Sequence, residues 1–211
     1  MAQKESSFLN MVVTLTIVAL VAATVLGFVH DLTKADIELA KKVAQEKAIK
    51  SVLPPFDNLG ESWKALPADG ADSLEFFPAF DAEKKLVGVA VKTYTKNGFS
   101  GLITLMAGIS ADGNISGYEI LEHKETPGLG SKMDVWFKDE NKPSQNIIGK
   151  SPETSNLEVT KDGGEVDAIT ASTITSRAFL EAIKRAYNTY KEAGLQEVTA
   201  KADANKEGGQ S

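Results

Sequence analysis

The longest apolar run in the chain begins near the N-terminus, and no charged residue occurs from Phe8 to Val29. Its length matches the roughly 20 apolar residues that a helix needs to cross a bilayer. A core helix would be apolar on one face only, and a cleaved signal peptide has a shorter apolar core followed by small residues at the cleavage site. The pattern therefore predicts an uncleaved transmembrane anchor at 8–29, preceded by a short head at 1–7.

The segment that follows the anchor, 30–55, places apolar residues at helical spacing with charged residues between them. Thr33 is a candidate N-cap, and the pair Pro54 and Pro55 is expected to end the helix. We therefore expect a stem helix here. Residues 56–80 contain scattered aromatic side chains and no clear period, which favours a loop-rich segment.

The hydrophobic period changes to two from Leu86, as is typical of a half-buried strand. Two more strands are expected at 102–109 and 115–123. Turn signals at 96–98 and 111–114 separate the three strands. Such short connections predict an antiparallel meander.

One amphipathic helix is predicted from about Ile174, with Gly194 as its C-cap. The residues before it, 124–165, show no regular period. The fold class is therefore α+β: an anchor and stem, then one compact domain at 56–195 with an antiparallel sheet and flanking helices. A polar tail at 196–211 is expected to be flexible.

Composition narrows the chemistry that this chain can perform. The net charge of -6 and the lack of a Lys/Arg cluster argue against nucleic acid as a partner. With no cysteine and two histidines, we expect no thiolate catalysis, no cysteine-ligated iron–sulfur cluster and no His-rich metal site. Any redox chemistry would need a cofactor held without sulfur. Charges beside the anchor differ too little for the positive-inside rule to assign its orientation.

Hydroxyl side chains crowd the start of the last helix, in the run DAITASTITSR from Asp167 to Arg177. A helix N-terminus offers unpaired N–H groups and the positive end of the helix dipole, which together favour a phosphate. An ordinary N-cap is the alternative, but a cap needs one hydroxyl. This segment has five: Thr170, Ser172, Thr173, Thr175 and Ser176.

A second motif, HKETPGLG, spans His123 to Gly130. Pro-Gly marks a tight turn, and glycine allows the backbone to approach a flat ligand closely. From spacing alone, a plain turn after the third strand is the simpler interpretation, with His123 as a surface residue at the strand end.

Together, the two motifs resemble those of the FMN-binding domain family. More specifically, they resemble those of the G subunit of the Rnf ion-translocating electron transport complex. The related C subunit of the sodium-pumping NADH:quinone reductase shares both motifs. The resemblance covers nearly the whole chain except the tail and residues 56–80. It implies that a flavin transferase links the phosphate of FMN to a threonine hydroxyl as a phosphoester.

The position of that threonine follows from the usual form of the motif, which is Asp, two residues, Ser or Thr, Gly, Ala and the acceptor Thr. Asp167 and Thr170 match the first two defined positions. Ala171 stands where glycine is usual and Ser172 where alanine is usual, so the resemblance makes Thr173 the acceptor. Replacement of that glycine matters most if the position requires a positive φ.

The resemblance also assigns lesser roles. Thr175 and Ser176 are weaker alternative acceptors. The loop of the other motif is expected to pack against the isoalloxazine ring, with Thr126 and Leu129 as the favoured contacts. The full set of expected loop residues is Glu125, Thr126, Gly128, Leu129 and Gly130.

By this resemblance the chain is a membrane-anchored electron-transfer subunit on the periplasmic, outer face of the bacterial inner membrane. The complex would move electrons between reduced ferredoxin and NAD⁺, coupled to Na⁺ or H⁺ movement. The chain has no glycine-rich nicotinamide fingerprint and few polar groups in its single span, so partner subunits are required. Two alternatives stay open: the quinone reductase subunit, and a cofactor-free single-span scaffold, adhesion or sensor domain.

Overall fold

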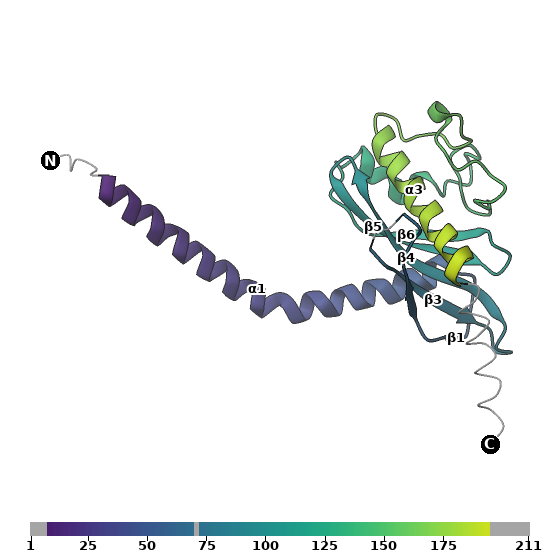
Figure 1. Cartoon of the computed structure of the whole chain (residues 1–211), viewed down its shortest axis with the longest axis horizontal. Coiled ribbons are helices and arrows are strands. Elements are labelled where there is room, and N and C mark those ends of the chain that lie inside the picture. Colours follow the sequence, from purple (N-terminus) through teal and green to yellow (C-terminus); the bar gives the residue numbers. More distant parts are fainter. Residues whose placement is uncertain (1–7, 70–71, 195–211) are drawn as a thin grey trace, which may run out of the picture. The chain divides into compact units, whose positions relative to one another are not determined.

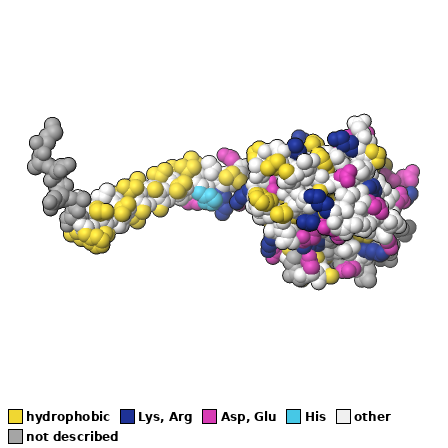
Figure 2. All heavy atoms as spheres, turned by 90° about the horizontal axis from the view of Figure 1, so that it is seen from above, with side chains coloured by type: hydrophobic (Ala, Val, Ile, Leu, Met, Phe, Trp, Pro, Cys, Tyr) yellow, Lys and Arg dark blue, Asp and Glu magenta, His cyan; other side chains and the backbone are white. Residues whose placement is uncertain are grey.

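The apolar run forms part of a 45-residue helix, α1, over Phe8–Val52 in the computed structural model (Figure 1). The structure describes residues 8–69 and 72–194, so the predicted head and the predicted tail lie outside the described residues. The helix is long and apolar enough to cross a membrane, and its most apolar stretch is exposed throughout. Figure 2 shows hydrophobic side chains along its surface. A membrane-spanning segment therefore has a physical basis in this helix.

Hydroxyl groups inside α1 are satisfied by its own backbone. Thr14, Thr16 and Thr24 each donate to the carbonyl oxygen four residues earlier at 2.8 Å, which makes them tolerable in an apolar environment. Thr33 does the same towards Val29 at 2.9 Å. The prediction that Thr33 caps a separate helix is therefore wrong, because the helix is already formed on both sides of it.

The chain divides after Ala44 into two compact units, so the last turns of α1 belong to the second unit. α1 ends at Val52, two residues before Pro54. A proline disfavours helical conformation in the residue before it, which explains the position of this end.

The second unit is built on one six-stranded antiparallel sheet with the order β1-β3-β4-β5-β6, in which β2 also pairs with β3. The meander predicted from the period-two pattern is β4–β5–β6. The strands are β1 (Asn58–Leu59), β2 (Trp63–Ala65), β3 (Leu74–Phe80), β4 (Leu86–Gly98), β5 (Gly101–Ser110) and β6 (Ile115–Glu122). With the helices, this arrangement confirms the predicted α+β class.

Successive side chains of the sheet enter two separate cores, because a strand alternates its faces. Val89 and Val91 point to the face covered by helix α3 (Thr173–Thr189), which lies across the sheet in Figure 1. Ala90, between them, belongs to the other core, which includes Ile49 from α1. Both faces of the central strands are therefore buried.

The end of α1 lies directly on the backbone of the sheet. A Cβ at Gly108 of β5 would collide with the carbonyl oxygen of Val52. That oxygen also accepts a hydrogen bond of 2.6 Å from the hydroxyl of Ser116 on β6. Glycine at position 108 is thus what allows helix and sheet to approach so closely.

The expected loop-rich character of 56–80 is wrong, since β1, β2 and β3 lie there. Pro78 hides the strand pattern of β3, because proline is rare within a sheet. The structure accommodates it opposite the gap between β1 and β2, where the Pro78 carbonyl accepts from Gly60 N–H at 2.8 Å. The aromatic residues are also ordered: Phe76 stacks on Trp63 with ring centroids 5.2 Å apart.

The first predicted turn is displaced. Residues 96–98 belong to the end of β4, where the register of the ladder shifts, and the chain reverses at Phe99 and Ser100. The turn signal therefore marks an irregularity in the strand, two residues before the actual reversal.

Aromatic packing fixes the irregular segment between β6 and α3. Phe137 stacks on Phe179 of α3 with centroids 4.4 Å apart. The Tyr118 hydroxyl donates to Met133 O at 2.6 Å and accepts from Phe137 N–H at 3.2 Å, and burial raises the pKa of this tyrosine. The described residues also form short helical turns: η1 (Gly130–Lys132), α2 (Met133–Trp136), η2 (Thr160–Asp162) and the π-turn η3 (Tyr190–Gly194).

We predict that Gly108→Ala lowers the free energy of unfolding by about 1–3 kcal/mol, because the added methyl forces α1 off the sheet. Ser116→Ala removes only a hydrogen bond and is expected to cost about 1 kcal/mol. Urea unfolding of the full chain in detergent, followed by tryptophan fluorescence, measures both. A Gly108→Ala variant as stable as the wild type would contradict the close approach at Gly108.

Candidate functional site

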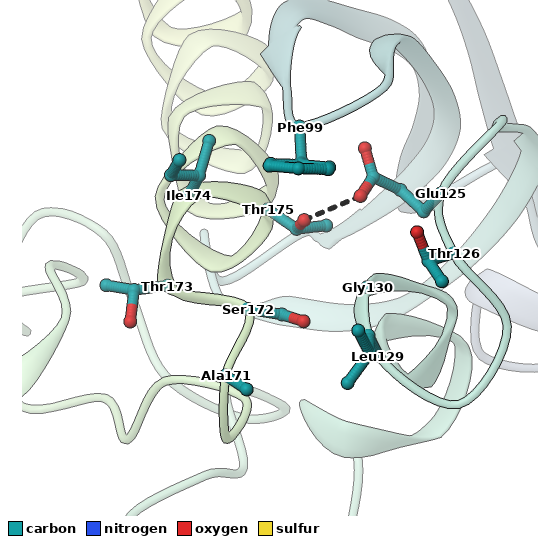
Figure 3. Close-up of a pocket in the computed structure, with 10 residues that line it drawn as sticks. All are labelled: Phe99, Glu125, Thr126, Leu129, Gly130, Ala171, Ser172, Thr173, Ile174 and Thr175. Carbon is teal, nitrogen blue, oxygen red and sulfur yellow. Dashed lines mark hydrogen bonds between the residues drawn. The ribbon is translucent and has the colours of Figure 1, made fainter.

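A cavity of about 330 Å³ lies where three segments distant in sequence meet (Figure 3). The β4–β5 turn, the loop after β6 and the start of α3 each contribute to it. Both sequence motifs are therefore brought together. The lining residues are Phe99, Glu125, Thr126, Leu129, Gly130, Ala171, Ser172, Thr173, Ile174 and Thr175.

Glu125 joins all three segments. The residue is 5% exposed, and its carboxylate accepts two hydrogen bonds, from Ser100 N–H at 2.9 Å and from the Thr175 hydroxyl at 2.7 Å. Figure 3 shows the second bond across the cavity. Its own N–H donates to His123 Nδ1 at 3.0 Å. Glu125 thus holds the β4–β5 turn and α3 at a fixed separation.

Gly130 is the position that leaves room for this carboxylate. A Cβ there would collide with the Glu125 carboxylate and would lie 2.8 Å from Thr175 Oγ1. The terminal glycine of the sequence motif is therefore required by close packing against Glu125. Gly128 has a φ of +76° and forms the turn itself, outside the cavity lining.

Ala171, which stands where related motifs have glycine, has a φ of +60°. An L-residue with a side chain is strained in this left-handed region. Position 171 therefore does require a positive φ, which is the case in which replacement of the usual glycine matters most. Ser172 follows as the N-cap residue of α3, yet its side chain makes no capping hydrogen bond. The hydroxyl-rich start of the helix is not explained by capping at Ser172.

Thr173 is the first residue of α3 and lies at the edge of the cavity, half-buried. In Figure 3 its side chain points away from Leu129. Its Oγ1 accepts a hydrogen bond from Lys161 Nζ at 3.3 Å. The hydroxyl predicted to be the acceptor is thus accessible and has an ammonium group beside it.

The two alternative acceptors are buried. Thr175 is 1% exposed and its hydroxyl is committed to Glu125. Ser176 is fully buried; its hydroxyl accepts from Ile169 N–H at 2.9 Å and donates to Ser172 O at 3.0 Å. Both side chains hold the start of α3 together, and their burial argues against a role as acceptor.

The remaining predicted site residues lie outside the cavity lining. Asp167 is fixed through its backbone, since its N–H donates to Ser144 O at 2.7 Å and its carbonyl accepts from Trp136 Nε1 at 2.8 Å. Thr170 is exposed in the turn before Ala171. These two residues shape the approach to α3.

The sequence did not indicate a role in the site for three residues: Phe99, Ile174 and Lys161. Phe99 and Ile174 are large apolar side chains that are 69% and 50% exposed, and with Leu129, 41% exposed, they give the cavity an apolar rim. The hairpin turn signal located Phe99 without indicating a role. No pattern in the sequence indicated a role for Lys161, because it lies in a segment without a regular hydrophobic period. An apolar rim beside a hydroxyl and a cation suits a ligand with a flat ring and an anionic end.

The model of the FMN-binding domain family matches residues 98–188, a span that contains both motifs. The G subunit of the ion-translocating oxidoreductase complex of Aliivibrio fischeri is 32% identical over 186 residues, which is 84% of this chain and 87% of the relative. The G subunit of the same complex from Erwinia tasmaniensis is 33% identical over 178 residues, 82% of this chain and 85% of the relative. Among solved structures, Shewanella oneidensis NqrC aligns with a TM-score of 0.45 and 23% identity, covering 65% of this chain and 69% of that chain.

We predict that Ala171→Gly raises the free energy of unfolding by about 1 kcal/mol. The substitution relieves a left-handed conformation that costs about 1–2 kcal/mol, less the entropy that glycine adds to the unfolded chain. Ala111→Gly, at an exposed turn position with ordinary φ, is the control and should be neutral or destabilising. The urea midpoints of the two variants and the wild type, measured in detergent, show whether each glycine raises or lowers the stability. A loss of stability in Ala171→Gly would contradict the strain.

We also predict that Thr175→Val destabilises the chain by about 2 kcal/mol, because it leaves one oxygen of the buried Glu125 carboxylate without its donor. Thr175→Ser keeps the hydroxyl and should cost less. In a double-mutant cycle with Glu125→Gln the two changes should be coupled by about 0.5–3 kcal/mol. Additive costs would show that the two side chains act independently.

Proposed function

The chain belongs to the family of the G subunit of the ion-translocating oxidoreductase complex, and on that premise we propose that it is a membrane-anchored electron-transfer subunit with FMN attached covalently to Thr173. One observation carries the site assignment. The Thr173 hydroxyl is accessible at the cavity edge and contacts Lys161, whereas the neighbouring hydroxyls of Thr175 and Ser176 are buried and occupied.

The residues present fit FMN at both ends of the cofactor. Phe99, Leu129 and Ile174 offer apolar surface for a flat ring system. Lys161 and the N-terminus of α3 offer positive charge for the phosphate. The left-handed turn at Ala171 brings the chain to the start of the helix without a bulky side chain. We propose Thr126 and Leu129 as the loop contacts to the ring.

FMN, when bound, supplies reversible uptake and release of electrons, and the chain supplies position and electrostatics. Glu125 holds the turn that carries Phe99 against α3, so the apolar rim keeps its shape. Thr173 fixes the phosphate end of the cofactor. In this proposal no side chain acts as nucleophile or general base in the electron-transfer step.

Attachment would require a flavin transferase and an activated flavin nucleotide. Thr173 Oγ would form the new bond to phosphorus while the phosphoanhydride bond of the donor breaks. The nucleoside monophosphate would leave with the electrons of that bond, and the hydroxyl proton would pass to solvent. The half-buried position of Thr173 at the cavity edge leaves its hydroxyl accessible to such an enzyme.

The chain acts as one redox subunit of a larger complex and is not a complete enzyme alone. We propose that the complex couples electron transfer between ferredoxin and NAD⁺ to Na⁺ or H⁺ movement. We further propose that α1 anchors the chain in the bacterial inner membrane, with the FMN-binding domain on the periplasmic side. Both relatives described above are named as the G subunit of the ion-translocating complex, which favours this assignment over the quinone reductase subunit.

We predict that co-expression with a flavin transferase yields a fluorescent band on a denaturing gel, and that Thr173→Ala abolishes it without unfolding the domain. Thr154→Ala, which removes an exposed hydroxyl outside both motifs, is the matched control and should keep the band. A band that survives in Thr173→Ala would move the attachment to another hydroxyl. A dark wild-type band, with the transferase active on another substrate, would leave the cofactor-free domain as the better account.

A further inference from the structure

We infer that Lys161 binds the phosphate anion attached at Thr173, an inference that rests on the proposed function and assigns a residue outside both sequence motifs. Lys161 lies in η2 and Thr173 is the first residue of α3, yet Nζ and Oγ1 are 3.3 Å apart. The two side chains are therefore in direct contact.

The backbone that carries Lys161 is held firmly, although the side chain is exposed. Val159 and Val166 are fully buried and form a parallel bridge on either side of it. Thr160 N–H donates to Val166 O at 2.9 Å, and Asp162 N–H donates to Val159 O at 2.8 Å. The lysine therefore starts from a fixed point close to α3.

Ion pairs tie this segment to α3 and set the charge around Thr173. Arg177, one turn after Thr173, donates to both oxygens of Asp162, at 2.6 and 2.8 Å. These bonds hold the pKa of Asp162 below its usual value, and the charge of Lys161 contributes in the same direction. Arg177 and Asp162 pair with each other, while the side-chain hydrogen bond of Lys161 is made to Thr173.

An ammonium group gains little from a neutral hydroxyl and much more from a phosphate oxygen. Hydrogen bonds between ionised partners are shorter and about twice as strong as neutral ones. A phosphodiester at Thr173 would carry one negative charge, and the dipole of α3 would favour it at the same place. Lysine is a regular phosphate ligand in proteins, as a point charge on a flexible stem. The contact seen at Thr173 Oγ1 thus places the ammonium group where the anion would be.

The test compares the full chain, co-expressed with a flavin transferase, as wild type, Lys161→Met, Lys161→Arg and Lys64→Met. Lys64 is an exposed lysine on β2, outside the cavity lining, and its variant is the matched control. Circular dichroism checks that each variant is folded. The phosphorus NMR resonance of the labelled proteins is followed into the alkaline range, where lysine loses its proton. The initial rate of labelling at limiting transferase is read from in-gel flavin fluorescence.

We expect a step in the phosphorus resonance of wild type and Lys64→Met that is absent from Lys161→Met. We also expect the initial labelling rate of Lys161→Met to be about fivefold lower than that of the wild type, which corresponds to the upper range of the energies of exposed ion pairs. Lys161→Arg keeps the positive charge and should restore the rate. Identical titration curves and rates in all four proteins would overturn the inference while leaving covalent FMN at Thr173 intact. A wild type without label would overturn the proposed function itself, and the inference with it.

Discussion

The buried carboxylate of Glu125 is the constraint on which the site depends. A charge removed from water is costly unless its oxygens are paired, so each of its two hydrogen bonds has to form. One donor, Ser100 N–H, lies in the β4–β5 turn, and the other, the Thr175 hydroxyl, lies in the first turn of α3. The three segments therefore assemble together. These contacts fix the walls of the cavity relative to one another, and glycine at position 130 leaves space for the carboxylate.

The sheet places this contact where it is useful. One face of the sheet packs against α3 and the other against the last turns of α1, so the central strands are fixed from both sides. The hairpin turn, the loop after β6 and the N-terminus of α3 then meet at one place. Aromatic packing of Phe137 on Phe179 sets the intervening irregular segment against the same helix. Rigid elements thus position loops that have no regular structure of their own.

Local patterns made the long apolar N-terminal helix, the meander and the last helix predictable, because each follows from the distribution of hydrophobic residues. β3 was missed because Pro78 breaks the pattern of a strand, and the structure accommodates it only through the gap between β1 and β2. Within the site, Thr173 and the loop motif followed from resemblance. Phe99 and Lys161 did not, since their roles depend on contacts between distant segments. A lysine in an irregular loop gives no periodic signal of what it will face.

A covalent linkage at Thr173 would also explain why the cavity is open. The side chains of its apolar rim are between 41% and 69% exposed, so a flavin ring held by contacts alone would gain only part of the stabilisation that full burial gives. A tether at Thr173 removes the need for that burial, because it keeps the ring at a high local concentration. An accessible ring is what an electron carrier between partner subunits requires. In the proposed function, the covalent linkage therefore compensates for the incomplete burial of the ring in the open cavity.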